Sequence, residues 1–425
     1  MQEKGRMAVQ TAGLTMAKSS LHIQISALDR PGILAETLGF IVDAGWNVVD
    51  IKQFVFNGML NLSILLDGDD TLISPLKEVL TRYAEQRNFK VAIYPLKQEI
   101  QTEVPYSHRS VVTLLCETFP SKAFLEITKT FADLDINIMR IEQLDSGDIQ
   151  VLEFVIGTQN AHSTEDVLNA LVRFKENYRV DIAVQEETYF RRNKRLIVFD
   201  ADMTFLQCEV IDELGKLACQ GERMKNITRQ AMSGELDFKS ALRERVGLLK
   251  GLPEKALEEL SDNLPLTSGA ENLVKILKYL GYKIAMVSGG FDYFIKKLCD
   301  RYELDYGIAN RLKIENGLVT GELEGEIIDA EGKENALVSL AEKEGFSLRQ
   351  VVAVGDGAND IKMLAKAGLG IAFNAKPIVQ RQAQASINLH DLKLILYFLG
   401  INGLDLQELS KVVGNSSTQS WPKKR

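Results

Sequence analysis

The chain has 425 residues, of which 45% are hydrophobic and 25% are charged, and its formal net charge is −8. This composition is typical of a globular protein, and the length predicts two or three domains. The acidic balance argues against nucleic acid as a partner, and the chain has no apolar stretch long enough to predict a membrane span.

The cysteines and histidines, four of each, are scattered along the chain without a C-x-x-C pair. This pattern indicates a reducing compartment and predicts neither a disulfide framework nor a zinc site. Because the first twenty residues lack the apolar core of a signal peptide, we expect a cytoplasmic protein. A bound metal would have oxygen ligands, which favours Mg²⁺.

Residues 20–98 predict the order strand, helix, strand, strand, helix, strand. A hairpin is expected at Asn57-Gly58, a favoured two-residue turn. The same order returns over residues 108–187, so the sequence predicts two tandem α+β domains of the ferredoxin-like arrangement.

The first copy resembles an ACT domain through the stretch "LDRPGILAETLGFIVDAGWNVVDI". The resemblance implies a possible amino-acid effector site at the loop of Asp29, Arg30, Pro31 and Gly32, and sheet pairing in a homodimer. The alternative is that this loop is only a turn with proline and glycine in their usual places. The second copy has "ETFPSKAF" at the corresponding position, so it is a degenerate ACT-like domain whose assignment depends on element order.

Residues 195–400 read as apolar strands alternating with helices, which predicts a parallel sheet with helices on both faces. "LIVFD", "KIAMVSGG", "VVAVGDG" and "LGIAF" are the expected strands. Three of them end in polar or glycine residues, and the carboxyl ends of parallel strands are where such sheets build their sites.

Carboxylates gather at two of these strand ends. Asp200 and Asp202 follow the first strand, and Asp356, Asn359 and Asp360 follow the third on a glycine-rich turn. Crowded carboxylates repel one another unless a cation lies between them, so the pattern predicts an oxygen-ligated Mg²⁺ site.

Two further pieces suit an anionic substrate. Ser288-Gly289-Gly290 offers a hydroxyl and exposed backbone N–H groups to a phosphate, although a tight turn capping a helix is the alternative. Lys333 would be a surface lysine on its own, but beside an acidic phosphate site its ammonium would offset charge repulsion.

Taken in order, D-x-D-x-T, S-G-G, Lys and G-D-G-x-N-D resemble the haloacid dehalogenase phosphatases, and most closely the phosphoserine phosphatases. The resemblance implies a Rossmann-like core in which Asp200 is the nucleophile and Asp202 the general acid/base. It also implies that Asp200, the backbone carbonyl of Asp202, and Asp356 hold Mg²⁺. The phosphoryl oxygens would be held by Thr204, Ser288, Gly289 and Lys333, with Asn359 and Asp360 orienting the ligands.

A helical cap is expected over about residues 207–268, because the interval between the first two motifs is helical in pattern and too long for a loop. By the same resemblance, Glu209 would bind a substrate ammonium and Arg245 a carboxylate, with Phe238 and Met232 lining the pocket. Without the resemblance, Glu209 and Arg245 would be interpreted as solvated charged residues of a helix. The chain departs from the family at Met203, where serine is usual.

The resemblance therefore implies an Mg²⁺-dependent phosphatase that converts O-phospho-L-serine to L-serine and phosphate through an aspartyl-phosphate, the last step of serine biosynthesis. One alternative keeps the chemistry but changes the substrate to phosphohomoserine, phosphothreonine or another small phosphomonoester. Another is a serine sensor whose phosphatase half has decayed, which the intact Asp200, Asp202, Lys333 and Asp356 argue against. A P-type ATPase fragment is excluded because no membrane spans are predicted.

Overall fold

The computed structural model describes residues 18–96, 106–159, 164–232 and 235–415. The chain forms two compact units, Met1–Pro105 and Tyr106–Arg425. Within the described residues, no helix is both long enough and apolar enough to cross a membrane.

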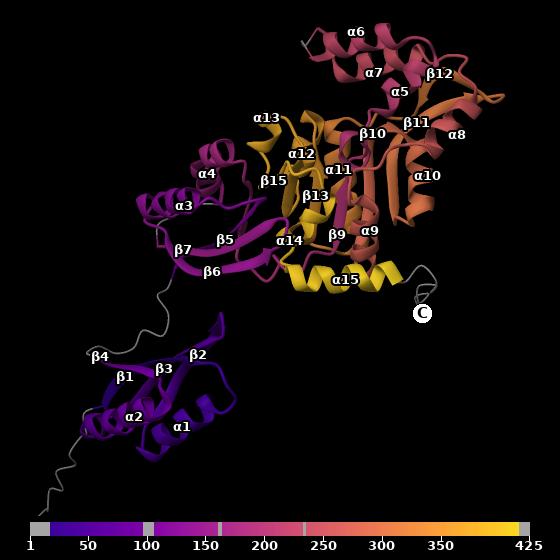
Figure 1. Cartoon of the computed structure of the whole chain (residues 1–425). Helices are drawn as coiled ribbons and strands as arrows, with labels where there is room; N and C mark the ends of the chain where they lie inside the picture. Colours follow the sequence, from indigo (N-terminus) through magenta and orange to yellow (C-terminus); the bar gives the residue numbers. More distant parts are fainter. Residues whose placement is uncertain (1–17, 97–105, 160–163, 233–234, 416–425) are drawn as a thin grey trace, which may run out of the picture. The chain divides into compact units, whose positions relative to one another are not determined.

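The first unit is a four-stranded antiparallel sheet covered by two helices, with strand order β2-β3-β1-β4 (Figure 1). Its elements are β1 (Lys18–Leu28), α1 (Ile33–Asp43), β2 (Asn47–Phe56), β3 (Met59–Asp69), a short turn of helix at Asp70–Leu72, α2 (Ile73–Arg87) and β4 (Lys90–Leu96). The predicted element order is confirmed. Asn57 and Gly58 both have positive φ, 48° and 75°, which is the conformation that the tight turn between β2 and β3 requires.

The second unit begins with the same fold. Its elements are β5 (His108–Cys116), α3 (Ser121–Asp133), β6 (Asn137–Ser146), β7 (Gln150–Thr158), α4 (Thr164–Tyr178) and β8 (Asp181–Glu186). We call residues 106–187 the second small domain. The predicted repeat of element order is therefore confirmed by the secondary structure.

The C-terminal region continues as a parallel α/β fold. Its strands are β9 (Leu196–Phe199), β10 (Lys283–Phe291), β11 (Tyr306–Glu315), β12 (Leu318–Glu324), β13 (Val351–Gly355), β14 (Leu369–Phe373) and β15 (Ala385–Ile387). Its core helices are α9 (Ala270–Tyr279), α10 (Asp292–Tyr302), α11 (Ala330–Glu344), α12 (Ile361–Lys366), α13 (Pro377–Gln380), α14 (Ile395–Phe398) and α15 (Gly403–Asn415). Short helical turns lie at Leu348–Gln350, Ala358–Asp360 and Leu392–Leu394.

Strand β9 lies at the centre of this sheet, paired in parallel with β10 and β13, and all four of its residues are buried. Ile197 and Phe199 pack into one apolar cluster, and Leu196 and Val198 pack into another on the opposite face. Helices therefore cover both faces, and the predicted doubly covered α/β core is confirmed.

Four helices, α5 (Val210–Leu217), α6 (Gly221–Met232), α7 (Phe238–Gly247) and α8 (Glu254–Asp262), lie between the turn after β9 and helix α9. We call residues 207–268, which contain these helices, the cap. Figure 1 shows α5, α6 and α7 gathered beyond one end of the sheet.

The sheets of the second small domain and the C-terminal region are continuous, which the sequence did not predict. Strand β15 pairs antiparallel with β8 at Ala385 and Ala183, giving one eleven-stranded sheet in the order β12-β11-β10-β9-β13-β14-β15-β8-β5-β7-β6. The backbone N–H of Val184 also donates to the carbonyl of Gln384 at 3.0 Å. The second small domain is thus built into the C-terminal region.

Candidate active site

Two aspartates, Asp200 and Asp202, follow the carboxyl end of β9 and line the same cavity. Asp200 follows the last strand residue, is 4% exposed, and donates its backbone N–H to the carbonyl of Val354 on β13. The next residues form a tight turn, Ala201–Phe205, in which Met203 has a positive φ of 56°. Met203 is 44% exposed, and its side chain does not line the site cavity.

Lys333 joins the strand ends from α11. Its ammonium is fully buried and donates to Oδ1 of Asp200 at 2.6 Å and to Oδ1 of Asp360 at 2.7 Å. Burial alone would lower the pKa of Lys333, but the two carboxylates outweigh it and raise the pKa above its ordinary value. Lys333 therefore carries a fixed positive charge against the predicted nucleophile.

The carboxylates of Asp200, Asp356 and Asp360 form a cluster in which one oxygen of each lies within 4.8 Å of the others. Burial and the charge of Asp360 raise the pKa of Asp200 well above its usual range. Burial, Asp360 and Glu209 raise the pKa of Asp356 to about 7. This crowding of buried oxygens fits a hard divalent cation, which would relieve the repulsion that raises both pKa values.

Glycine at position 355 is required by this cluster. A Cβ there would lie 2.5 Å from Cγ of Asp360, so any other residue would displace that carboxylate. The backbone N–H of Gly357 donates to Oδ2 of Asp360 at 2.9 Å, which fixes the carboxylate on the turn. Thr204 Oγ1 donates to Oδ1 of Asp356 at 3.2 Å and ties this turn to the first motif.

The S-G-G turn lies near the carboxyl end of β10, where a Cβ on Gly290 would be 3.1 Å from Oδ2 of Asp202. Ser288 is 1% exposed, and its Oγ accepts a hydrogen bond from the backbone N–H of Gly290 at 2.8 Å. Asn310 holds the turn in place: its Nδ2 donates to the carbonyl of Gly289 at 2.7 Å, and its Oδ1 accepts from Ile328 N–H at 2.7 Å. Asn310 was not among the predicted site residues, because its role depends on contacts between distant segments.

A cavity of about 90 Å³ lies between the strand ends and the cap. The core contributes Asp200, Asp202, Asp356 and Asn359, and the cap contributes Glu209, Phe238 and Arg245. Gly289 and Gly290 of the S-G-G motif and Gly357 of the G-D-G-x-N-D motif also line it. Further lining residues, which the sequence did not single out, are Ile211, Leu242 and Phe291. The side chain of Met232, also predicted to line the pocket, lies outside the described residues.

Charges in this cavity are poorly solvated. Burial and the charge of Asp212 raise the pKa of Glu209, while burial and Glu209 raise the pKa of Asp202 to about 7. Burial lowers the pKa of Arg245, and its Nε is buried without a hydrogen-bond partner in the described structure. The cap thus presents one acidic and one basic side chain with unused bonding capacity to the cavity.

The loop predicted as an effector site lies in the first unit and has its own internal contacts. Arg30 donates to both carboxylate oxygens of Glu36, at 3.0 and 2.9 Å. Asp29 N–H donates to the carbonyl of Gly58 at 2.8 Å, Pro31 accepts from Arg30, and Gly32 adopts a φ of 96° before α1. These contacts fix the loop, and its role as an effector site stays a prediction.

Comparison with known families separates the chain into three parts. Residues 197–365 match the haloacid dehalogenase-like hydrolase family, and residues 20–94 and 107–185 each match an ACT domain family. The predicted combination of a haloacid dehalogenase core and two ACT domains is confirmed.

Relatives of nearly the whole chain are known. It is 36% identical over 393 residues to a phosphoserine phosphatase of Streptomyces coelicolor, covering 92% of this chain and 94% of the relative. It is 34% identical to a phosphoserine phosphatase of Mycobacterium tuberculosis, covering 91% and 94%. Among solved structures, a haloacid dehalogenase family hydrolase of Salmonella enterica superposes with a TM-score of 0.60 at 29% identity, covering 68% of this chain and 98% of that one.

Proposed function

Because the chain belongs to the phosphoserine phosphatase family and is a phosphatase, we propose that it hydrolyses O-phospho-L-serine through an aspartyl-phosphate on Asp200. L-Serine and phosphate would be the products, which makes this the final step of serine biosynthesis. The observation that carries the proposal is the buried Lys333, whose ammonium lies 2.6 Å from the Asp200 carboxylate. A lysine in that position holds the nucleophile and offsets the charge of an incoming phosphoryl group.

The first step is an attack by an Asp200 oxygen on phosphorus. The new O–P bond forms as the ester P–O bond breaks, and the leaving alkoxide takes a proton from Asp202. Burial supports this role for Asp202, since its pKa of about 7 lets it carry a proton near neutral pH. Water then attacks phosphorus, returns a proton to Asp202, and releases phosphate and the Asp200 carboxylate.

Mg²⁺ would be held by Asp200, Asp356 and the backbone carbonyl of Asp202. When bound, it neutralises charge on the phosphoryl oxygens. Asp360 fits a supporting role, because Lys333 and Gly357 already occupy one oxygen each of its carboxylate. Thr204, Ser288, Gly289 and Lys333 would hold the phosphoryl oxygens. Of these four, Gly289 lines the cavity, as does Asn359.

Substrate choice would come from the cap. Glu209 suits the ammonium of an amino acid, and Arg245, with its unpartnered Nε, suits the carboxylate. The pair favours an amino-acid phosphomonoester over other phosphate esters. Phosphohomoserine and phosphothreonine carry the same two groups and remain the alternative substrates, which kcat/KM values on the three esters would rank.

The decisive experiment measures phosphate release from O-phospho-L-serine with and without Mg²⁺. We expect Mg²⁺-dependent turnover in the wild type and a loss of about 10³-fold or more in Asp200→Asn. Asp262→Asn, whose side chain is 60% exposed on the cap surface, is the matched control and should keep full activity. Wild-type activity that survives in Asp200→Asn would exclude the aspartyl-phosphate, and no turnover on any ester would favour a serine sensor.

The first unit would provide assembly and regulation. Strand β2 is at the edge of its sheet and is exposed along its whole length, with Phe54 and Phe56 62% and 67% exposed. An exposed apolar edge strand pairs readily with a second copy, which supports a homodimer. An amino-acid effector at Asp29–Gly32 would be detected as saturable binding of L-serine that is lost in Arg30→Ala.

A further inference from the structure

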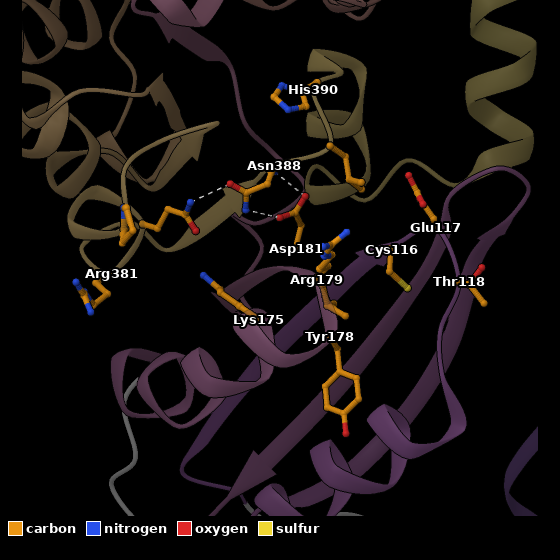
Figure 2. A pocket seen from close by; sticks show the side chains of 14 residues that line it. Cys116, Glu117, Thr118, Lys175, Tyr178, Arg179, Asp181, Arg381, Asn388 and His390 are labelled. Carbon is orange, nitrogen blue, oxygen red and sulfur yellow. Dashed lines mark hydrogen bonds between the residues drawn. The ribbon is translucent and has the colours of Figure 1, made fainter.

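A second cavity, of about 690 Å³, lies where the second small domain meets the C-terminal region (Figure 2). One wall comes from the end of β5, the end of α4 and the start of β8, and the other from α13 and the segment after β15. It shares no lining residue with the candidate active site. Neither the family resemblance nor the proposed mechanism uses it.

The back of this cavity is a chain of hydrogen bonds across the junction. Asp181 accepts from the backbone N–H of Asn388 at 2.7 Å and from its side-chain Nδ2 at 2.8 Å. Asn388 Oδ1 in turn accepts from Gln380 Nε2 at 2.8 Å, as the dashed lines in Figure 2 show. The polar groups of the back wall are therefore committed to one another and hold the two walls together.

The basic side chains of the cavity do not take part in this chain of hydrogen bonds. Lys175 and Arg179 come from the small domain and Arg381 from the end of α13, and within the described residues none of the three has an ion-pair partner. Figure 2 shows Lys175 extending from α4 into the space between the walls. Burial lowers the pKa of Lys175 to about 8, and the nearby charge of Asp181 only partly offsets this.

The balance of charge favours an anion. Three basic side chains and His390 line the cavity against two acidic ones, Asp181 and Glu117, and Asp181 is already bonded to Asn388. The basic groups project from both walls, so an occupant with negative oxygens at two points could meet both. A desolvated ammonium without a carboxylate partner gains most from such a ligand.

We propose that this cavity binds a small dianion, a dicarboxylate or a phosphoryl compound. Calorimetry on the full chain with succinate and with methylphosphonate as probes tests the site itself and distinguishes the two kinds of anion.

We expect saturable binding of one probe, weakened about tenfold by Lys175→Gln and by Arg381→Gln. The controls Lys122→Gln and Arg82→Gln remove side chains that are 78% and 64% exposed elsewhere and should leave binding unchanged. Binding that all four variants keep would place the anion at the phosphate site of the active centre and overturn the proposal. No saturable binding by either probe would overturn it as well.

Discussion

The two small domains have the same order of elements but different surroundings. In the first, the four-stranded sheet is complete in itself and β2 is exposed along its length. In the second, the sheet continues through β8 and β15 into the parallel sheet, and Leu115, Leu144, Val151 and Ala183 belong to the same apolar core as β9. One fold therefore serves as a separate module in one place and as part of the enzyme's core in the other.

The strongest test of this difference is deletion. A fragment of residues 106–425 should fold and keep phosphatase activity, because the described strands of the removed unit form a sheet and an apolar core of their own. A fragment of residues 188–425 exposes β15 as a new edge and removes part of the core, so we expect a loss of about 5 kcal/mol or more in the free energy of unfolding. Urea unfolding of both fragments measures their free energies of unfolding. Equal values for the two fragments would contradict the view that the second small domain is part of the core.

The first unit and the second small domain also differ in the burial of their ion pairs, and here we expect smaller effects on stability. Glu153 on β7 is buried and pairs with the buried Arg191 of the linker, with Arg140 and Arg192 at 3.4 and 3.6 Å. Glu153→Gln leaves these arginines without their carboxylate and should cost about 3–5 kcal/mol in the free energy of unfolding. Glu36→Gln in the first domain removes a partly exposed partner of Arg30 and should cost far less, as parallel urea titrations would show.

Acidification should affect the domains differently. Burial raises the pKa of Asp181 to about 6, so the folded state takes up a proton between pH 6 and 3.8 that the unfolded state does not, and stability rises as the pH falls through this window. Arg30 lowers the pKa of Glu36 to about 2, so its contribution is complete above pH 4.5 and is lost only as the pH falls toward 2.

Between pH 7 and 5 we therefore expect Asp181 to add about 1 kcal/mol to the free energy of unfolding while Glu36 adds nothing. The free energy of unfolding is measured at both pH values, in the presence of a metal chelator, for the wild type, Asp181→Asn and Glu36→Gln. The comparison isolates the contribution of each carboxyl group to the pH dependence. A pH dependence that Asp181→Asn leaves unaltered would show that other buried carboxyls account for all of it.

The smallest effect on stability is expected on the exposed face of β2. Phe54→Lys should leave the free energy of unfolding within about 0.5 kcal/mol of the wild type, because the side chain is 62% exposed. If β2 is the dimer surface, sedimentation should show weaker self-association. Ile141→Lys on β6, where the side chain is 45% exposed, is the matched change in the second small domain. A stronger effect of Ile141→Lys would transfer the dimer surface to β6.

Much of the fold and the active site could be predicted because local patterns determine them. Asp200 and Asp356 directly follow apolar strands, Ser288 lies near the carboxyl end of another, and the carboxyl ends of parallel strands lie at one edge of the sheet. The junction could not be predicted in this way. Strand β15 has only three residues, and the bonds from Asn388 to Asp181 join positions 207 residues apart. Asn310 was missed for the same reason, since its bonds to Gly289 and Ile328 depend on tertiary packing.

The volume of the candidate active site has a consequence for selectivity. About 90 Å³ is well below the roughly 300 Å³ at which pockets for small ligands begin, so under the proposed function we expect the cap to move outward when substrate enters. If Glu209 and Arg245 bind the ammonium and the carboxylate as proposed, a phosphoserine inside a polypeptide has neither group to offer them. Phosphorylated serine within proteins would thus be spared, and the free metabolite alone consumed.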